Sequence, residues 1–181
     1  KLRTKHMIKK KKLRVLLLST NSDEAGAPLH VETLVRMLRK DVEFILMFGE
    51  DGPVARRLLS AGFNVQILHG MHSSISPIHD IKLLRTLYQL IRDIKPDLIH
   101  CHSSKAGLLG RLAGRLQDLP VLFTIHGWSW ASLSGPKSRL ALFIERQVAH
   151  LHNVHYLYVC RAVEDLGREK LGLNPFQGQV I

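Results

Sequence analysis

Residues 96–127 read PDLIHCHSSKAGLLGRLAGRLQDLPVLFTIHG and contain two apolar runs separated by one helical segment. The runs at 97–102 and 121–125 have the composition of buried strands. Between them, a helix that opens at Ser103 or Ser104 carries apolar residues at helical spacing, namely Leu109, Leu112, Ala113 and Leu116. Parallel strands need such a crossover helix because a tight hairpin cannot join them. The segment therefore predicts a β-α-β unit.

The same alternation continues along the rest of the chain. We expect further strands over 13–19, 42–48, 65–68, 155–160 and 179–181, and further helices over 28–38, 53–61, 77–95, 137–151 and 162–171. The strands are continuous apolar runs, which is typical of a parallel sheet covered on both faces. The sequence thus predicts an α/β fold. We expect a Rossmann-like, doubly wound parallel sheet with helices on both faces, formed by residues 13–181 after a basic tail at 1–12.

The chain has 181 residues and a formal net charge of +11, most of it near the N-terminus. The first fourteen residues contain eight Lys and Arg and no acid, whereas the rest contains eighteen against fifteen acids. Such a run is either a solvated terminus or a segment attracted to an anionic membrane face, at about 1 kcal/mol per basic residue. It lacks interleaved aromatic residues for base stacking, which argues against a nucleic-acid partner. Met7 can be the native start, with residues 1–6 then derived from a vector.

Hydropathy and cysteine content restrict the class of protein further. The sequence contains no run of about 18 apolar residues, so it indicates no membrane span. Cys101 and Cys160 both lie in apolar runs, and two thiols do not make a disulfide framework. We expect both to be reduced core residues of a cytoplasmic protein.

Open parallel sheets bind ligands at the carboxyl ends of their strands, so candidate site residues are those that follow Ser19, His102, Ile125 and Cys160. After the first strand, Gly26 and Ala27 precede or begin a helix whose free N–H groups can accept a phosphate. The loop contains neither a GxGxxG nor a GxxxxGK[ST] pattern. An ordinary β-to-α turn is therefore the alternative interpretation.

A polar group follows the strand at 97–102 and consists of His102, Ser103, Ser104 and Lys105. It can hold an anionic or hydroxyl-rich ligand, or it can serve only as a strand end and helix cap. His100 lies on the same side of the strand as His102, but no HExxH or CxxC pattern supplies further ligands. We therefore expect no metal site. Gly107 and Gly110 indicate close packing of the helix on the sheet.

The strand at 121–125 ends in His126 and Gly127, and Gly127 leaves space beside the imidazole. Taken alone, a histidine at this position is either structural or faces a ligand. Trp128 and Trp130 can stack on a sugar or can simply cover a loop. After the sixth strand, Arg161 can meet an anion or form a surface ion pair. The sequence leaves these alternatives open.

Three segments, KPDLIHCHSSKAGLLGRLAGRL, PVLFTIHGWSW and YLYVCRAVEDLG, resemble the N-terminal domain of family 4 retaining glycosyltransferases, which have the GT-B fold. The matching positions are Pro96, Asp97, His100, His102, Gly107, Gly110, Arg111, Thr124, His126 and Gly127. AGAPLHVETLVRML also resembles the family's glycine-rich loop and first helix. Two positions depart from the family pattern, since Ala25 replaces one of the paired glycines and Cys160 stands where serine is common. The similarity is greatest to bacterial capsule, exopolysaccharide and O-antigen enzymes.

The resemblance implies that the full-length protein transfers a sugar from a nucleotide-sugar to a lipid-linked saccharide acceptor, with retention and without a metal or other cofactor. It gives His126 a catalytic, substrate-facing role. It places Gly26, Ala27 and Gly127 beside the donor phosphates. It also suggests that the loop at 69–77 shapes an acceptor pocket lined by His102, Ser103, Ser104, Lys105 and Trp128.

The family's C-terminal donor-binding domain does not appear in this sequence. We therefore expect the acceptor-side half of an enzyme, inactive alone, in the cytoplasm and peripheral at the inner face of the bacterial plasma membrane. Two alternatives are a GT-B-fold nucleotide-sugar epimerase and a non-catalytic basic binding domain.

Overall fold

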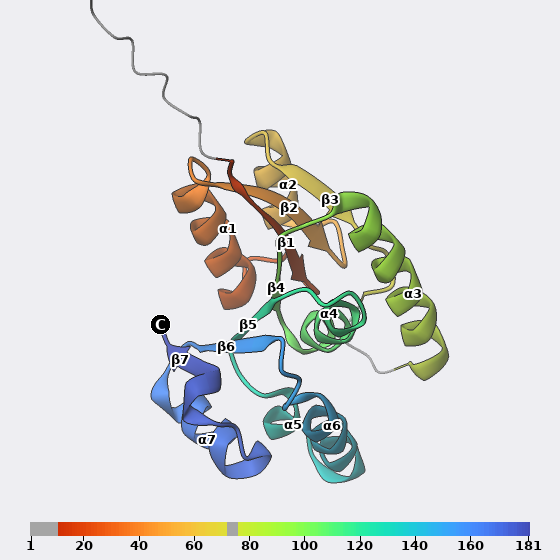
Figure 1. Cartoon of the computed structure of the whole chain (residues 1–181), viewed down its shortest axis with the longest axis vertical. Coiled ribbons are helices and arrows are strands. Elements are labelled where there is room, and N and C mark those ends of the chain that lie inside the picture. The colour runs from red at the N-terminus through yellow and green to blue at the C-terminus, as the bar shows by residue number, and fades with distance from the viewer. Residues whose placement is uncertain (1–10, 72–75) are drawn as a thin grey trace, which may run out of the picture.

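A computed structural model describes residues 11–71 and 76–181, which fold around a seven-stranded sheet (Figure 1). All paired strands are parallel, and their order is β3-β2-β1-β4-β5-β6-β7. The strands are β1 Leu13–Ser19, β2 Val42–Phe48, β3 Asn64–Ile67, β4 Leu98–His102, β5 Val121–Ile125, β6 Val154–Tyr158 and β7 Gly178–Val180. The predicted parallel sheet is confirmed. Of the predicted basic tail, only residues 11 and 12 are among the described residues.

Helices connect successive strands throughout. They are α1 Gly26–Leu38, α2 Pro53–Ser60, α3 Pro77–Ile94, α4 Ser104–Leu116, α5 Ser129–Ser132, α6 Gly135–Val148 and α7 Arg161–Leu171, with a 3-10 helix η1 at Pro175–Gln177. In Figure 1, α1 and α4 lie on opposite sides of the sheet. No helix in the described ranges is long and apolar enough to cross a membrane.

The apolar strands fill two cores, one on each face of the sheet. In β1, Val15 and Leu17 face the core formed with α1 and α2, whereas Leu16 and Leu18 face the core formed with α3, α4, α6 and α7. Successive side chains of a strand point to opposite faces, so a strand buried on both sides must be apolar at every position. The doubly wound arrangement explains why these strands show no in/out pattern.

Helix α4 lies close to the sheet because small residues face it. A Cβ atom at Gly107 would lie 2.5 Å from the Phe123 ring, and one at Gly110 would lie 2.2 Å from Cys101 Sγ. These distances are too short for any side chain larger than glycine, so the predicted packing role of both glycines is confirmed. The close approach fixes the N-terminus of α4 next to the end of β4.

The strand order determines where the predicted site lies on the sheet. Strand β1 pairs with β2 on one side and with β4 on the other, so the chain reverses its direction of winding between β1 and β4. Ligands bind outside the carboxyl ends of strands at such a switch point. Since β1, β4, β5 and β6 are consecutive neighbours, the four predicted strand ends meet at one edge.

Several local predictions were wrong. Pro28 lies in the first turn of α1, as the sequence predicts, whereas the short helix α5 was not anticipated. Leu116 is 61% exposed rather than buried, whereas Ala113 and Gly114 of the same turn are buried. Cys160 is exposed, unlike the buried Cys101, because β6 ends at Tyr158 and the cysteine stands at the N-cap position of α7.

Candidate functional site

A cavity of about 370 Å³ opens at the carboxyl edge of β1, β4 and β5. Its wall combines strand ends with the first turns of α1, α3 and α4, and a side of α6. The polar side chains in this wall include Thr20, Asp80, Ser103, Lys105, His126 and Glu145. This volume is within the usual range for small-molecule sites, and the position agrees with the binding edge of an open parallel sheet.

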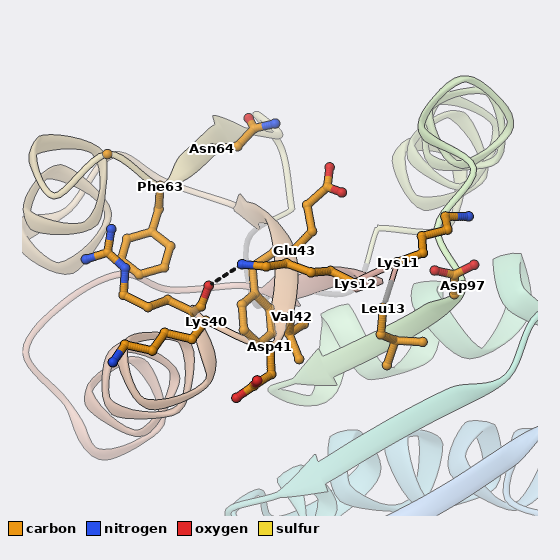
Figure 2. A pocket seen from close by; sticks show the side chains of 13 residues that line it. Lys11, Lys12, Leu13, Lys40, Asp41, Val42, Glu43, Phe63, Asn64 and Asp97 are labelled. Carbon is orange, nitrogen blue, oxygen red and sulfur yellow. Dashed lines mark hydrogen bonds between the residues drawn. The ribbon is translucent and has the colours of Figure 1, made fainter. Parts of the chain in front are cut away.

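A larger depression, of about 1280 Å³, lies at the opposite edge, where β1 and β2 begin (Figure 2). Its basic side chains do not converge on a common point. Lys12 Nζ donates a hydrogen bond to the Arg39 carbonyl at 3.0 Å, while the Lys11 and Lys40 side chains extend in opposite directions in Figure 2. A binding site needs polar groups that converge on one ligand. The carboxyl-edge cavity is therefore the better candidate.

The ends of β1 and β4 are held together by Ser103. Its hydroxyl oxygen accepts a hydrogen bond from the Thr20 backbone N–H at 3.1 Å and also contacts the Thr20 hydroxyl. Ser103 has φ 70° and ψ 155°, a conformation that is strained for any residue with a Cβ atom. Strained residues of this kind cluster at ligand sites, and Ser103 lines the cavity.

Four histidines gather on the α1 face of the sheet, next to the cavity. His100, His102 and His126 come from the ends of β4 and β5, and His30 comes from α1. The His30 ring centroid lies 5.6 Å from that of His102 and 5.2 Å from that of His126. His100 Nε2 hydrogen-bonds the Thr124 hydroxyl at 2.8 Å, and His102 Nδ1 hydrogen-bonds His126 Nε2 at 3.2 Å.

All four imidazoles are neutral at pH 7. Burial, assisted by the neighbouring His30, lowers the pKa of His100 and of His126 to about 4. Burial also lowers the pKa of His102 and of His30 below the ordinary histidine value. A neutral imidazole can still donate one hydrogen bond and accept another. No group of three or more His, Cys, Asp or Glu within the described ranges is arranged to hold a metal ion.

Lys105 is buried in the cavity wall, where its ammonium forms an ion pair with Asp80 of α3. Lys105 Nζ lies 2.6 Å from Asp80 Oδ1, and Asp80 Oδ2 also accepts a hydrogen bond from the Ser76 backbone N–H. Sequence reasoning selected Lys105 but missed Asp80, which lies twenty-five residues earlier and has no local motif. The pair gives this wall neighbouring hydrogen-bond donors and acceptors with little net charge.

A second buried ion pair lies on the α4 face, and its acidic partner, Glu145, also lines the cavity. Arg111 is fully buried and donates to both carboxylate oxygens of Glu145, at 2.6 and 3.0 Å. It also donates to the Gly107 carbonyl and to the Tyr156 hydroxyl. Only the family resemblance pointed to Arg111, and nothing in the sequence pointed to Glu145 on α6. All of these contacts lie within the protein, so the pair acts as a support for α4.

The tryptophans cover a loop. Trp128 and Trp130 are buried, their rings stack with centroids 5.7 Å apart, and Trp128 Nε1 donates to the Val163 carbonyl at 2.8 Å. Gly167 of α7 packs directly against the Trp128 ring. A ring enclosed in this way cannot stack on a sugar. The burial of Trp128 therefore favours the loop-covering alternative that the sequence left open.

The remaining predicted residues differ in their surroundings. No side chain caps α1, and a Cβ atom at Gly26 or at Gly127 would meet nothing within 4 Å. Neither glycine is therefore required by packing, and Ala27 and Gly127 both line the cavity. Ser104 lines it as well, whereas His102 lies behind His126. Arg161 is exposed at the start of α7, and the loop at 69–77 is only partly within the described residues.

Fold and cavity together define a doubly wound α/β domain with a cavity at the carboxyl edge of its sheet. The chain belongs to the glycosyl transferase 4-like domain family, which it matches over residues 25–181. This confirms the family inferred from the strand-end motifs. The four histidines, Lys105 and the acidic residues of the cavity wall named above all lie within the matched range.

Comparison with individual proteins agrees with this family. Over 60 residues, 33% of the chain, it is 48% identical to the Escherichia coli UDP-Gal:α-D-GlcNAc-diphosphoundecaprenol α-1,3-galactosyltransferase, and the match covers 16% of that protein. The structure resembles Anabaena HepE in complex with UDP and glucose, with a TM-score of 0.71 and 18% identity over 93% of this chain and 44% of HepE. It also resembles a Rickettsia bellii UDP-N-acetylglucosamine 2-epimerase, with a TM-score of 0.65 and 11% identity over 94% of this chain and 44% of the epimerase. The chain spans less than half the length of each of these proteins.

Proposed function

We propose that residues 13–181 form the acceptor-side half of a retaining glycosyltransferase that moves a sugar from a nucleotide-sugar to a lipid-linked saccharide. The observation that carries the proposal is the coincidence of the family match with a cavity at the carboxyl edge of the sheet. The galactosyltransferase relative is named for a UDP-sugar donor and a diphosphoundecaprenol acceptor, which supports these substrate classes. HepE, which shares the fold, was crystallised with UDP and glucose.

The donor diphosphate would lie against the first turn of α1. This turn has free backbone N–H groups and no capping side chain, and an anion there is favoured by the helix dipole. Gly26, Ala27 and Gly127 leave room for close approach. In the described part of the cavity, the ammonium of Lys105 is already paired with Asp80. We therefore expect a second domain to supply the cations that neutralise the diphosphate, and we expect neither a metal nor another cofactor.

The acceptor sugar would lie between α3, α4 and α6. Ser103, Ser104 and the Lys105–Asp80 pair offer both donors and acceptors to its hydroxyl groups. His126 would face the reacting region from the end of β5. The transition state needs stabilisation of a departing phosphate and a cationic sugar, and fixed hydrogen-bond donors serve this purpose.

A lipid-linked acceptor requires the enzyme to reach a membrane surface. Helices α3 and α6, which flank α4, carry exposed apolar residues, namely Ile78, Ile81, Leu140 and Phe143. Basic residues stand beside them, namely Lys82, Arg85, Lys137 and Arg139. Apolar side chains with a cationic border suit the interface of an anionic bilayer. We propose peripheral binding at the cytoplasmic face of the bacterial plasma membrane.

Flotation with liposomes tests the membrane proposal. We expect binding to anionic vesicles that weakens with salt and that is reduced by the double substitution Ile81→Ser and Phe143→Ser. A matched control, Leu59→Ser, changes an equally exposed leucine on α2, which lies on the other face of the sheet. Equal binding of all variants to neutral and anionic vesicles would contradict the proposal.

Product analysis tests the transferase proposal. The chain joined to a donor-binding domain should form a glycoside with retained anomeric configuration, and residues 1–181 alone should form little or none. His126→Ala should lower the rate by about 100-fold or more, as expected for loss of a donor at the reacting centre. Release of a free, epimerised nucleotide-sugar would instead identify an epimerase. A protein that makes neither product but binds nucleic acid through residues 1–12 would support the basic binding domain.

A further inference from the structure

His102 is a buried histidine whose two ring nitrogens have different surroundings. Its side chain is 0% exposed. Nδ1 lies 3.2 Å from Nε2 of His126, whereas Nε2 is buried and has no hydrogen-bond partner. The two histidines end neighbouring strands and face the same side of the sheet. The hydrogen bond between them therefore couples a residue inside the protein to one that lines the cavity.

A hydrogen bond between two neutral imidazoles has two possible directions. In the first, His102 carries its proton on Nδ1 and donates it to His126 Nε2, which leaves only a lone pair on the buried His102 Nε2. In the second, His126 donates to His102, and His102 must then keep an N–H on Nε2 in a place where it meets no acceptor. Buried N–H groups without a partner are rarer in proteins than under-satisfied acceptors. The surroundings of His102 Nε2 therefore favour the first direction.

We propose that His102 is a positioning residue that fixes His126 in the Nδ1–H tautomer, so that His126 presents a hydrogen-bond donor to the cavity. His126 Nδ1 makes no hydrogen bond within the described ranges and is not among the buried unpartnered atoms. It is therefore accessible. The ligand group that fits is an oxygen with a free lone pair, either a sugar hydroxyl or a phosphate oxygen. The identity of that ligand rests on the proposed function, whereas the tautomer does not.

This arrangement limits the chemistry of His126. Both of its nitrogens are committed, since Nε2 accepts from His102 and Nδ1 already carries a proton. His126 therefore cannot remove a proton from an acceptor hydroxyl through Nδ1. Its low pKa, about 4, keeps the imidazole neutral at pH 7, so it is not an acid either. It acts as a fixed neutral donor that stabilises negative charge on an oxygen.

Histidine ¹⁵N NMR of the labelled chain at pH 7 tests the tautomer directly. In the unsubstituted protein we expect His126 to be protonated at Nδ1 and unprotonated at Nε2. We expect the same assignment for His102. His102→Asn places an amide N–H near the position of Nδ1 and should preserve the His126 tautomer. His102→Leu removes the donor and should give His126 signals averaged between the two tautomers. A protonated Nε2 on His126 in the unsubstituted protein, or unchanged His126 signals in His102→Leu, would overturn the proposal.

Kinetics with the donor-binding domain present test the consequence for the reaction. His102→Leu should lower kcat at least about tenfold with little change in KM for the acceptor, and His102→Asn should restore most of the rate. An equal loss in both variants would contradict the positioning role. If the unsubstituted protein transfers no sugar, the proposed function fails, but the NMR assignment still decides the tautomer.

Discussion

Two polar clusters lie under the same cavity, on opposite faces of the sheet, and they differ in how completely their hydrogen bonds are made. On the α4 face, Arg111 is charged, and its guanidinium donates to Glu145, to Tyr156 and to a backbone carbonyl. On the α1 face, the imidazoles are neutral, and one of them, His102, keeps a buried nitrogen without a partner. Each cluster lies beside the end of a strand that forms the cavity wall.

The difference separates a structural role from a ligand-facing one. Burial lowers the pKa of Arg111, but the charge and hydrogen bonds of Glu145 outweigh it and raise that pKa overall, so the guanidinium stays charged. The buried guanidinium, with its hydrogen-bond partners in place, holds α4 and α6 together. The histidine cluster instead keeps unused hydrogen-bonding capacity at the cavity. We therefore expect substitutions in the first cluster to affect stability and substitutions in the second to affect ligand binding.

Breaking the charged cluster should have the largest effect. Arg111→Met leaves the Glu145 carboxylate buried without its partner, which should cost about 3–5 kcal/mol of unfolding free energy in urea titrations. The double substitution Arg111→Met and Glu145→Leu should recover most of that loss, because no charge then remains buried. Arg168→Met, which breaks a partly buried i,i+4 pair with Glu164 on the helix surface, is the control and should cost about 0.5 kcal/mol or less. A loss below about 1 kcal/mol for Arg111→Met would remove the structural role assigned to the pair.

Acid should weaken the histidine cluster. His100 has a folded pKa of about 4, below the unfolded value of about 6.5, so the unfolded chain binds more protons as the pH falls. Its contribution to stability is complete above pH 6.5 and declines between pH 6.5 and about 4, by up to about 3 kcal/mol. Urea titrations at pH 7, 6 and 5 measure the decline.

His100→Gln is the matched variant for this experiment. The glutamine amide can hydrogen-bond Thr124 as His100 Nε2 does, but it does not titrate. The variant should therefore show a smaller loss of stability between pH 7 and pH 5 than the unsubstituted chain. Identical pH profiles would mean that His100 is not the group whose protonation destabilises the fold.

Substitution of two glycines, Gly107 on the α4 face and Gly127 at the cavity, tests the same difference between a structural and a ligand-facing role. Gly107→Ala should cost about 1–3 kcal/mol, because the new methyl group would overlap the Phe123 ring, over which Arg111 stacks. Gly127→Ala meets nothing within 4 Å and should change stability by about 0.5 kcal/mol or less. If Gly127 approaches a bound sugar or phosphate, the same variant should weaken transfer. A Gly107→Ala protein as stable as Gly127→Ala would contradict the packing assigned to α4.

The sequence was sufficient to predict the sheet because the strands depend on local apolar composition. Continuous apolar runs located the strands that carry the site, and parallel geometry alone indicated that Ser103 and His126 would meet at one edge. The contacts between distant elements were not predictable in this way. Glu145 pairs with Arg111 across thirty-four positions, and Asp80 pairs with Lys105 across twenty-five, because α3, α4 and α6 pack side by side. No local pattern encodes such partners.

The burial of Trp128 and the exposure of Cys160 could not be read from the sequence. Trp128 follows a predicted site residue directly, but α5 and α7 enclose its ring, and neither the short helix nor its packing has a sequence signature. Cys160 belongs to an apolar run that continues past the end of β6, so composition alone placed it in the core. Whether a residue at the end of a strand faces the cavity or the core depends on the next connection, which the sequence specifies least.

A small difference in stability is expected between two variants of Ser103, which joins β1 to β4 between the two clusters. Ser103→Ala keeps the strained backbone and loses the bond from the Thr20 N–H, so it should cost about 1 kcal/mol. Ser103→Gly loses the same bond but relieves the positive φ, a strain of about 1–3 kcal/mol, so its stability should be close to that of the unsubstituted chain or higher. Urea titrations of both variants measure the difference. If Ser103→Gly is less stable than Ser103→Ala, the backbone at this strand end is not strained, and the serine is retained for its hydroxyl alone.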